Sequence, residues 1–197
     1  MDRKTTDTYN SSAKEYDEET KDFWERFPRT IIDKFAELTK GNVLDVGSGP
    51  GRDGLILREK GLEIVCLDAS ETMVKISSGK GLETVLGDFN SLPFPDDSFD
   101  GVWSYTALLH IPKTEIDKPL QEIGRVLKKD GVFGLGMIQG NNEEYRTSPM
   151  VSGERLFSFY TKQELEILLE KHGFKVVYFE DFQPRTSRYL NFISIKV

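Results

Sequence analysis

Short apolar runs alternate with segments of helical periodicity along most of the chain. Runs rich in branched residues that end in Gly or Asp are typical of strands, and apolar positions three and four apart are typical of helices. The predicted strands are NVLDVG at 42–47, EIVCLD at 63–68, ETVLGD at 83–88, FDGVWSYT at 99–106 and GVFGLGMI at 131–138. The predicted helices cover 29–38, 55–60, 73–77 and 115–127. Because strands and helices alternate, right-handed crossovers and a parallel sheet are expected.

The end of the chain follows a different pattern. Thr161 and Glu164 form a capping box, and Gly173 supplies the stop of the helix that this box begins. Two apolar runs follow, at 174–181 and 189–197, and their connection is too short for a crossover helix. These two runs should pair antiparallel. The expected fold is α/β: an open sheet of about seven strands, mostly parallel with an antiparallel C-terminal strand, and with helices on both faces.

Two segments lie outside the sheet pattern. Residues 1–28 are polar with interspersed aromatics, which predicts short helical pieces that form an N-terminal cap. Residues 139–160 have no clear period, and we interpret them as a loop or short helices that form a lid insertion between strands five and six. With 197 residues, the chain fits a single domain, 1–197.

The composition of the chain limits the classes of partner that the protein is expected to bind. The net charge of -7 and the pI near 5.0 disfavour a nucleic-acid surface, which needs clustered Lys and Arg. No apolar run reaches the ~20 residues of a spanning helix, and the start has no signal-like stretch, so we expect no membrane partner and a cytoplasmic location. Cys66 is the only cysteine, which excludes an internal disulfide and a cysteine-built zinc site and suggests a buried thiol. No metal-binding carboxylate cluster is evident either.

The strongest chemical signal is VLDVGSGPGRDG at 43–54, where an apolar strand meets Gly47, Gly49 and Gly51 ahead of a helix. Glycine permits positive φ and close approach of a ligand, at the strand end where open α/β sheets bind ligands. The glycines alone could simply make a tight turn. Asp68, however, ends the next strand 21 residues after Gly47 (68 minus 47), near the ~20-residue spacing at which an acidic side chain meets ribose hydroxyls.

The details of this motif discriminate between cofactors. A dinucleotide fingerprint beginning at Gly47 would require glycine at the position of Arg52. Asp45, two residues ahead of Gly47, would place negative charge near a pyrophosphate. A ligand with a cationic part is therefore more compatible with this turn than a dinucleotide.

At this point DVGSGPG resembles motif I of the class I S-adenosylmethionine-dependent methyltransferases, and the resemblance covers most of the chain, in the small-molecule, type 11-like branch. It implies a Rossmann-like sheet and S-adenosyl-L-methionine as cofactor. It also implies that Asp68 holds the ribose and that Asp88 and Phe89 meet the adenine. The further cofactor-binding positions it implies are Tyr9, Asp45, Gly47, Ser48, Gly49, Ala69, Ser70, Met73 and Ser104. The family's lysine-proline-glycine-glycine turn is replaced by Lys128-Lys129-Asp130-Gly131.

His110 follows the fourth strand at the edge of the expected cleft, where this branch often places a histidine. An imidazole can accept a proton near neutral pH, so His110 is the candidate catalytic base. The alternative, which we prefer, is that His110 bonds the backbone and shapes the turn before Pro112. His172 is expected to cap a helix, and Arg125 to form a helix-to-sheet ion pair.

The predicted activity is methyl transfer to an unidentified acceptor. No Asn-Pro-Pro-Tyr base-flipping motif follows strand four, where Ser104-Tyr105-Thr106-Ala107 stands, and this favours a small molecule. The aromatics Tyr145, Phe157, Phe159 and Tyr160 are expected to wall its site. The alternatives are a catalytically silent cofactor-binding module and, less favoured, an NAD-dependent oxidoreductase. The pattern does not address oligomeric state.

Overall fold

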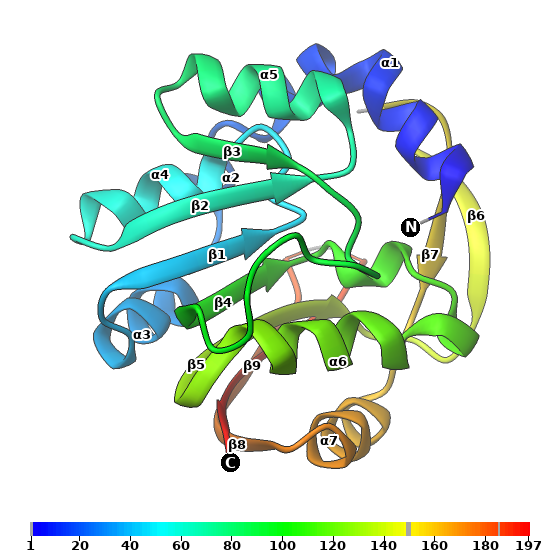
Figure 1. Ribbon diagram of the computed structural model, residues 1–197. Coiled ribbons are helices and arrows are strands. Elements are labelled where there is room, and N and C mark those ends of the chain that lie inside the picture. The colour runs from blue at the N-terminus through cyan, green and yellow to red at the C-terminus, as the bar shows by residue number, and fades with distance from the viewer. Residues whose placement is uncertain (1, 149–150, 185) are drawn as a thin grey trace.

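The computed structural model describes residues 2–148, 151–184 and 186–197, and a seven-stranded sheet runs through its centre (Figure 1). The strand order is β3-β2-β1-β4-β5-β9-β8. β9 is antiparallel to both of its neighbours, while β1 to β5 pair in parallel. The strands are β1 (Asn42–Val46), β2 (Glu63–Asp68), β3 (Glu83–Leu86), β4 (Phe99–Tyr105), β5 (Leu127–Ile138), β8 (Phe174–Phe182) and β9 (Tyr189–Lys196). The predicted sheet, including its antiparallel C-terminal strand, is confirmed.

Helices cover both faces of the sheet, as predicted. Successive residues of β1 show why: Val43 joins one buried cluster with α3 and α4, and Leu44 joins the other with α6 and α7. Alternating side chains of a strand point to opposite faces, so each face needs its own cover. The helices are α3 (Thr30–Leu38), α4 (Arg52–Glu59), α5 (Glu71–Gly79), α6 (Asp117–Val126) and α7 (Lys162–Lys171), with 3₁₀ turns η1 (Leu108–His110) and η2 (Lys113–Glu115).

Several local predictions are confirmed as well. The Thr161 capping box begins α7, and His172 is its C-cap residue. The thiol of Cys66 is free and buried. The predicted helix-to-sheet ion pair of Arg125 is wrong: Arg125 pairs with Glu122 of its own helix and with Asp96 of the loop before β4, and it bonds two carbonyls of that loop, which it holds in place. Among the described residues, none of the helices combines the length and apolar character needed to cross a membrane.

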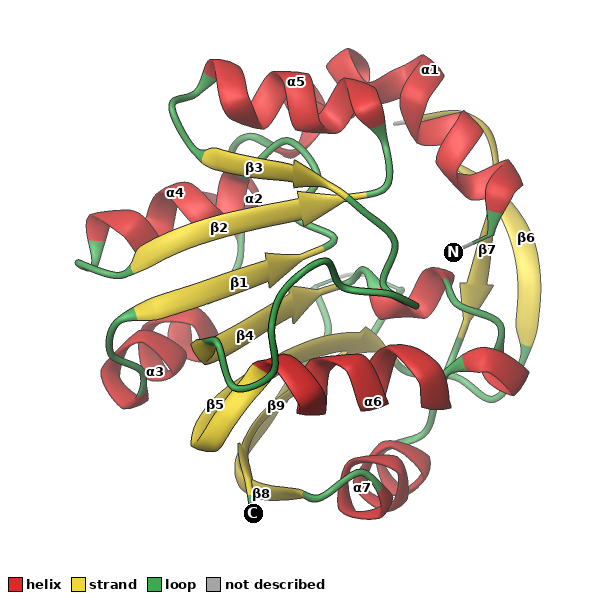
Figure 2. Cartoon of the chain, in the orientation of Figure 1, coloured by secondary structure: helices red, strands yellow, loops and turns green. Residues whose placement is uncertain are grey.

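The interpretation of 139–160 as a loop or short helices is wrong. Within this range β6 (Glu143–Ser148) and β7 (Val151–Ser158) form a separate antiparallel sheet of two strands (Figure 2). A two-stranded hairpin alone is marginal in water, so its stability has to come from what packs on it. That partner is remote in sequence, which explains why no short-range period announces these strands.

The partner of the hairpin is α1 (Arg3–Thr20), which is followed by α2 (Phe23–Arg26). The predicted short helical pieces at the N-terminus are thus mainly one long helix, with non-helical backbone at Ser12. The hydroxyls of Thr5, Thr8 and Ser12 lie along one side of α1 and bond the main chain of β7, at Leu156 N (2.9 Å), Glu154 O (2.9 Å) and Ser152 O (3.3 Å). The helix thus satisfies strand groups that would otherwise need water or another strand.

Candidate active site

The glycine turn after β1 forms the floor of the site. Gly47, Gly49 and Gly51 all have positive φ, at 72°, 54° and 82°. A Cβ on Gly47 would lie 2.3 Å from Ala107 Cβ, so this position excludes any side chain. At Gly49 the nearest atom to a Cβ would be Tyr16 Cε1 at 3.9 Å, an ordinary van der Waals contact, so this position is much less crowded. The turn therefore offers bare backbone to a ligand next to the start of α4.

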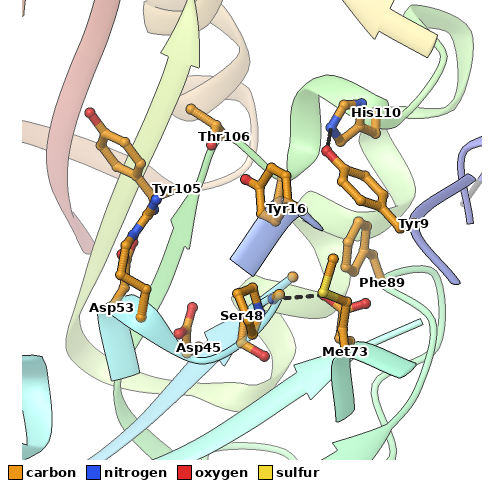
Figure 3. A pocket seen from close by; sticks show the side chains of 16 residues that line it. Tyr9, Tyr16, Asp45, Ser48, Asp53, Met73, Phe89, Tyr105, Thr106 and His110 are labelled. Atoms are coloured by element: carbon orange, nitrogen blue, oxygen red, sulfur yellow. Dashed lines mark hydrogen bonds and ion pairs between the residues drawn. The ribbon is translucent and has the colours of Figure 1, made fainter. Parts of the chain in front are cut away.

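A pocket lies at the carboxyl ends of β1, β2 and β4, beside this turn (Figure 3). The empty space in it, counted together with the open solvent at its mouth, is about 590 Å³. The lining residues are Tyr9, Tyr16, Asp45, Gly47, Ser48, Gly49, Pro50, Arg52, Asp53, Asp68, Met73, Phe89, Tyr105, Thr106, Ala107 and His110. We call this the cofactor pocket.

Helix α1 closes the cofactor pocket from above. Tyr9 and Tyr16 of α1 line it, with their rings edge to face at 5.4 Å between centroids. Three bonds hold the helix to α5 and its caps: Asn10 Oδ1 accepts from the hydroxyl of Ser70 (2.7 Å) and from Thr72 N (3.3 Å), and Lys80 pairs with Asp17 (2.6 Å). The predicted cap segment therefore does reach the predicted site.

Two buried carboxylates in the pocket differ in their surroundings. Asp68 accepts hydrogen bonds from Gly49 N (2.9 Å) and Ser70 N (2.8 Å), and burial outweighs these bonds in raising its pKa. Asp45 is buried and its Oδ2 has no hydrogen-bond partner. Burial, followed by the charge of Asp53, raises the pKa of Asp45 well above its usual value. A cationic ligand group would relieve both effects.

Beneath the pocket, Asp53 is the centre of a buried network. Its carboxylate accepts from the indole N–H groups of Trp24 (2.7 Å) and Trp103 (2.9 Å) and from Arg52 Nε (2.7 Å). The Arg52 guanidinium lies over the Phe23 ring, 4.4 Å from its centroid. The arginine that breaks the dinucleotide fingerprint is therefore a fixed cation on the pocket wall.

His110 takes part in a chain of hydrogen bonds at the pocket edge. Its Nδ1 lies 2.6 Å from the carbonyl of Leu156, which can only accept, so Nδ1 carries the proton. Nε2 then accepts from the Tyr9 hydroxyl (2.9 Å), as Figure 3 shows, and that hydroxyl accepts from Arg155 Nη1 (2.8 Å). Burial lowers the pKa of His110 to about 3. The imidazole is therefore neutral, with both nitrogens occupied.

A larger groove adjoins the cofactor pocket, and we call it the acceptor groove. Tyr9, Tyr16, Arg52, Thr106 and His110 line both. The groove continues between α1, α2, the β6–β7 hairpin and the segment before β9. Of the four aromatics predicted to wall an acceptor site, Phe157 and Phe159 line the groove, while Tyr145 is exposed and Tyr160 packs in the core.

The structure places the predicted cofactor-binding residues in two groups. Those that line the cofactor pocket are Tyr9, Asp45, Gly47, Ser48, Gly49, Asp68, Met73 and Phe89. The others lie around it: Ser70 caps α5, Ser104 donates to the Val46 carbonyl (3.1 Å), Asp88 accepts from Asn90 N (2.9 Å), and Ala69 precedes the cap. Roles for either group in cofactor binding stay predictions. Within the described ranges, no cluster of His, Cys, Asp and Glu suits a metal ion.

Some residues of the site escaped the sequence reasoning. Arg155 lies in a stretch without hydrophobic periodicity, and no neighbouring residue predicts its hydrogen bond to Tyr9. Arg52 stands out in the sequence only as a departure from glycine. Tyr16, one of the aromatics of the cap, also lines the pocket.

Comparison with known proteins agrees with this geometry. A family model of the methyltransferase domain matches residues 44–135. An uncharacterized protein of Methanocaldococcus jannaschii is 29% identical over 96% of this chain and 89% of its own length. An uncharacterized methyltransferase of Bacillus subtilis is 36% identical over 64% of this chain and 52% of its own. The Burkholderia thailandensis 1,6-didemethyltoxoflavin-N1-methyltransferase, solved with bound 1,6-didemethyltoxoflavin and S-adenosylhomocysteine, is similar in fold, with a TM-score of 0.72 at 20% identity over 97% of this chain and 88% of that chain.

The matched region begins within β1 and extends into β5, so it contains the glycine turn, Asp68 and the strands that carry them. This part of the chain is similar to a methyltransferase domain, and the comparisons together support a class I S-adenosylmethionine-dependent methyltransferase.

Proposed function

We propose that this methyltransferase transfers the methyl group of S-adenosylmethionine to a small molecule held in the acceptor groove. The observation that carries the proposal is the shared boundary: five residues line both the cofactor pocket and the groove. An acceptor in the groove would meet the reactive end of the cofactor there. The groove is enclosed by aromatic side chains of the cap and the hairpin, which suits a small apolar body rather than a polymer.

The residues of the cofactor pocket fit this cofactor. Asp45 has an unpartnered buried oxygen that suits the ammonium group of the methionine part, and Asp68 has lone pairs left for ribose hydroxyls. Met73 and Phe89 supply apolar surface for the adenine. When bound, the cofactor supplies an electrophilic methyl group on a sulfonium that leaves as a neutral thioether.

The contribution of the chain is then alignment and exclusion of water. Holding two reactants in line can supply about 7–11 kcal/mol of the barrier. Tyr9 and Tyr16 close the site. The hydrogen bonds from Arg155 to Tyr9 and from Tyr9 to His110 fix the wall at which the two reactants meet. With a pKa of about 3 and both nitrogens bonded, His110 is a weak base, which supports a positioning role over general-base catalysis.

Calorimetry with S-adenosylmethionine, S-adenosylhomocysteine and NAD tests the cofactor assignment. We expect both sulfur compounds to bind and NAD not to bind. Transfer of a labelled methyl group from the cofactor into a fractionated metabolite extract then tests catalysis. Label that appears in a small-molecule fraction supports the proposal. Binding without transfer to any fraction would instead favour a silent cofactor-binding module, and label only in protein or nucleic acid would refute the small-molecule acceptor.

A further inference from the structure

The charge of the acceptor groove differs from that of the whole chain. The net charge is -7, yet the described residues that line the groove include four arginines and no Asp or Glu. Arg52 is shared with the cofactor pocket, whereas Arg26, Arg146 and Arg155 line the groove alone. In a chain with more acidic than basic residues, a groove whose described charged lining residues are all arginines is not expected by chance.

The arginines lie against aromatic rings of the same groove. Arg146 lies over Phe159 at 4.4 Å from the ring centroid, and Arg155 lies over Phe157 at 5.1 Å. The rings of Phe157 and Phe159 are stacked, with 5.9 Å between centroids. A guanidinium held over a ring is pre-organised and weakly hydrated, which suits it to bind a carboxylate beside a planar apolar body.

Acidic side chains outside the groove occupy some of the N–H donors of these arginines. Arg26 pairs with Asp22 (2.8 Å) and Arg146 pairs with Glu144. Each guanidinium has five N–H donors, so one pair does not exhaust it. Both arginines are about half exposed, so an anion can reach them from the groove.

The adjoining cofactor pocket has the opposite character. Three of its lining residues are the buried Asp45, Asp53 and Asp68. A cationic ligand part suits that pocket, because these three carboxylates outnumber the cation Arg52 among the lining residues. The two compartments therefore separate charge along one continuous cavity, with the methyl-transfer boundary between them.

From this separation we infer that the acceptor is a planar aromatic acid. Its ring system lies among the aromatics of the groove, and its carboxylate lies against the arginines that line the groove alone. This inference rests on the proposed methyl transfer to a groove-bound acceptor. It also gives the acceptor an orientation, because like charge keeps the carboxylate away from the acidic cofactor pocket.

The test uses the full chain saturated with S-adenosylhomocysteine and a set of matched probes. Indole-3-acetate, indole-3-acetamide and tryptamine share a ring system and carry a negative, neutral and positive group; 1-naphthoate with its amide and amine analogues repeats the comparison. By calorimetry we expect each acid to bind at least ~10-fold tighter than its amide and the amine to bind weakest, as an arginine–carboxylate pair of about 1.4 kcal/mol or more would give.

Arg146→Gln should lower the affinity for the acids at least ~5-fold and change the affinity for the amides less than ~2-fold. Arg26→Gln, at a residue of α2, tests the same point should Arg146→Gln fold poorly. The matched control is Arg3→Gln, which removes the same charge from a side chain that is 96% exposed and outside the groove. It should change neither affinity.

The outcomes separate this inference from the proposed function. If S-adenosylhomocysteine itself does not bind, the cofactor assignment fails first. If it binds, and the amides or amines bind as tightly as the acids or no acid binds below millimolar concentration, the aromatic-acid inference is wrong while methyl transfer stands. A preference for acids that survives in both Arg146→Gln and Arg26→Gln would also overturn it.

Discussion

At the scale of single residues, three aspartates of the cofactor pocket differ in their hydrogen-bond partners. Asp53 is fully engaged by two indoles and an arginine, whereas Asp45 keeps an oxygen without a partner. Asp68 lies between these extremes, bonded to two backbone N–H groups yet lining the pocket. Burial of a carboxylate without full compensation is costly, and such positions are where ligands with donors are expected.

Asp68→Ala should weaken binding of S-adenosylhomocysteine about 10- to 100-fold, because ribose hydroxyls lose a charged acceptor worth ~1.5–3 kcal/mol. Calorimetry measures this, with circular dichroism to show an intact fold. Asp100→Ala is the control, since Asp100 also accepts from a backbone N–H, Asn42 (2.9 Å), but lies at the other end of β4. Equal affinity in Asp68→Ala and the wild type would remove Asp68 from the site.

The free energy of unfolding should fall in mild acid, because His110 is buried as a neutral imidazole. Its pKa is about 3 in the folded protein, below its ordinary 6.5, so between these values the unfolded chain binds more protons. Stability from the buried neutral imidazole is therefore present above pH 6.5 and is lost as pH falls toward 3. At pH 5 the loss relative to pH 7.5 is about 2 kcal/mol. Urea unfolding at both pH values checks this, and His110→Gln should show a loss smaller by that amount. An equal loss in both proteins would mean that His110 is not held neutral.

At the scale of elements, the docking of α1 on β7 decides whether the site is closed. The two elements approach closely at Gly153, which has φ 126°, and a Cβ there would lie 2.8 Å from the Thr8 hydroxyl. The row of hydroxyl-to-backbone bonds depends on this approach. Figure 2 shows the N-terminal turns of α1 beside the hairpin, while the rest of the helix runs toward α5.

Gly153→Ala should push α1 off the hairpin and weaken binding of S-adenosylhomocysteine about 10-fold, with a loss of stability of roughly 2–4 kcal/mol from strain and overlap together. Gly61→Ala is the control: Gly61 also has positive φ, 88°, but a Cβ there has nothing within 4 Å, so it reports strain alone. Limited proteolysis and hydrogen exchange should show faster opening of 2–28 only in Gly153→Ala. Similar behaviour of both variants would mean that the contact between Thr8 and Gly153 is unimportant.

At the scale of the whole molecule, the cap joins two parts of the chain across the cofactor pocket. α1 contacts β7 on one side and α5 on the other, so we expect the opening of either set of contacts to speed exchange of the cofactor. The contacts to α5 are fewer and partly exposed, which makes this the side expected to open. We therefore predict that bound ligand orders the segments 1–28 and 139–160. Hydrogen exchange in both segments should slow when the ligand binds.

Asp17→Ala should raise the dissociation rate of S-adenosylhomocysteine up to ~5-fold, because it removes an ion pair worth up to about 1 kcal/mol that holds the cap to α5. Stopped-flow displacement measures the rate. Glu18→Ala is the neighbouring control, since Glu18 pairs with Lys21 within the N-terminal segment and makes no bond to α5. Equal rates in both variants would show that exchange does not pass through the α1–α5 contact.

Much of the sheet and part of the site could be predicted from the sequence because their signals are local. The glycines at 47, 49 and 51 mark a turn whose positive φ values favour glycine, and Asp68 ends a strand that its own apolar run defines. The short connection before Tyr189 already required an antiparallel partner, and β9 is that strand.

The tertiary structure alone decided the hairpin, the acceptor groove and the state of His110. The pair Tyr9 and His110 is 101 residues apart, and Arg155 and Tyr9 are 146 apart, so no window of sequence contains either contact. The β6–β7 hairpin is stabilised by α1, which bonds the main chain of β7, and His110 is neutral because the folded chain buries it. Periodicity and turn chemistry act over a few neighbours, whereas burial, charge and shape of a site depend on which distant segments the fold brings together.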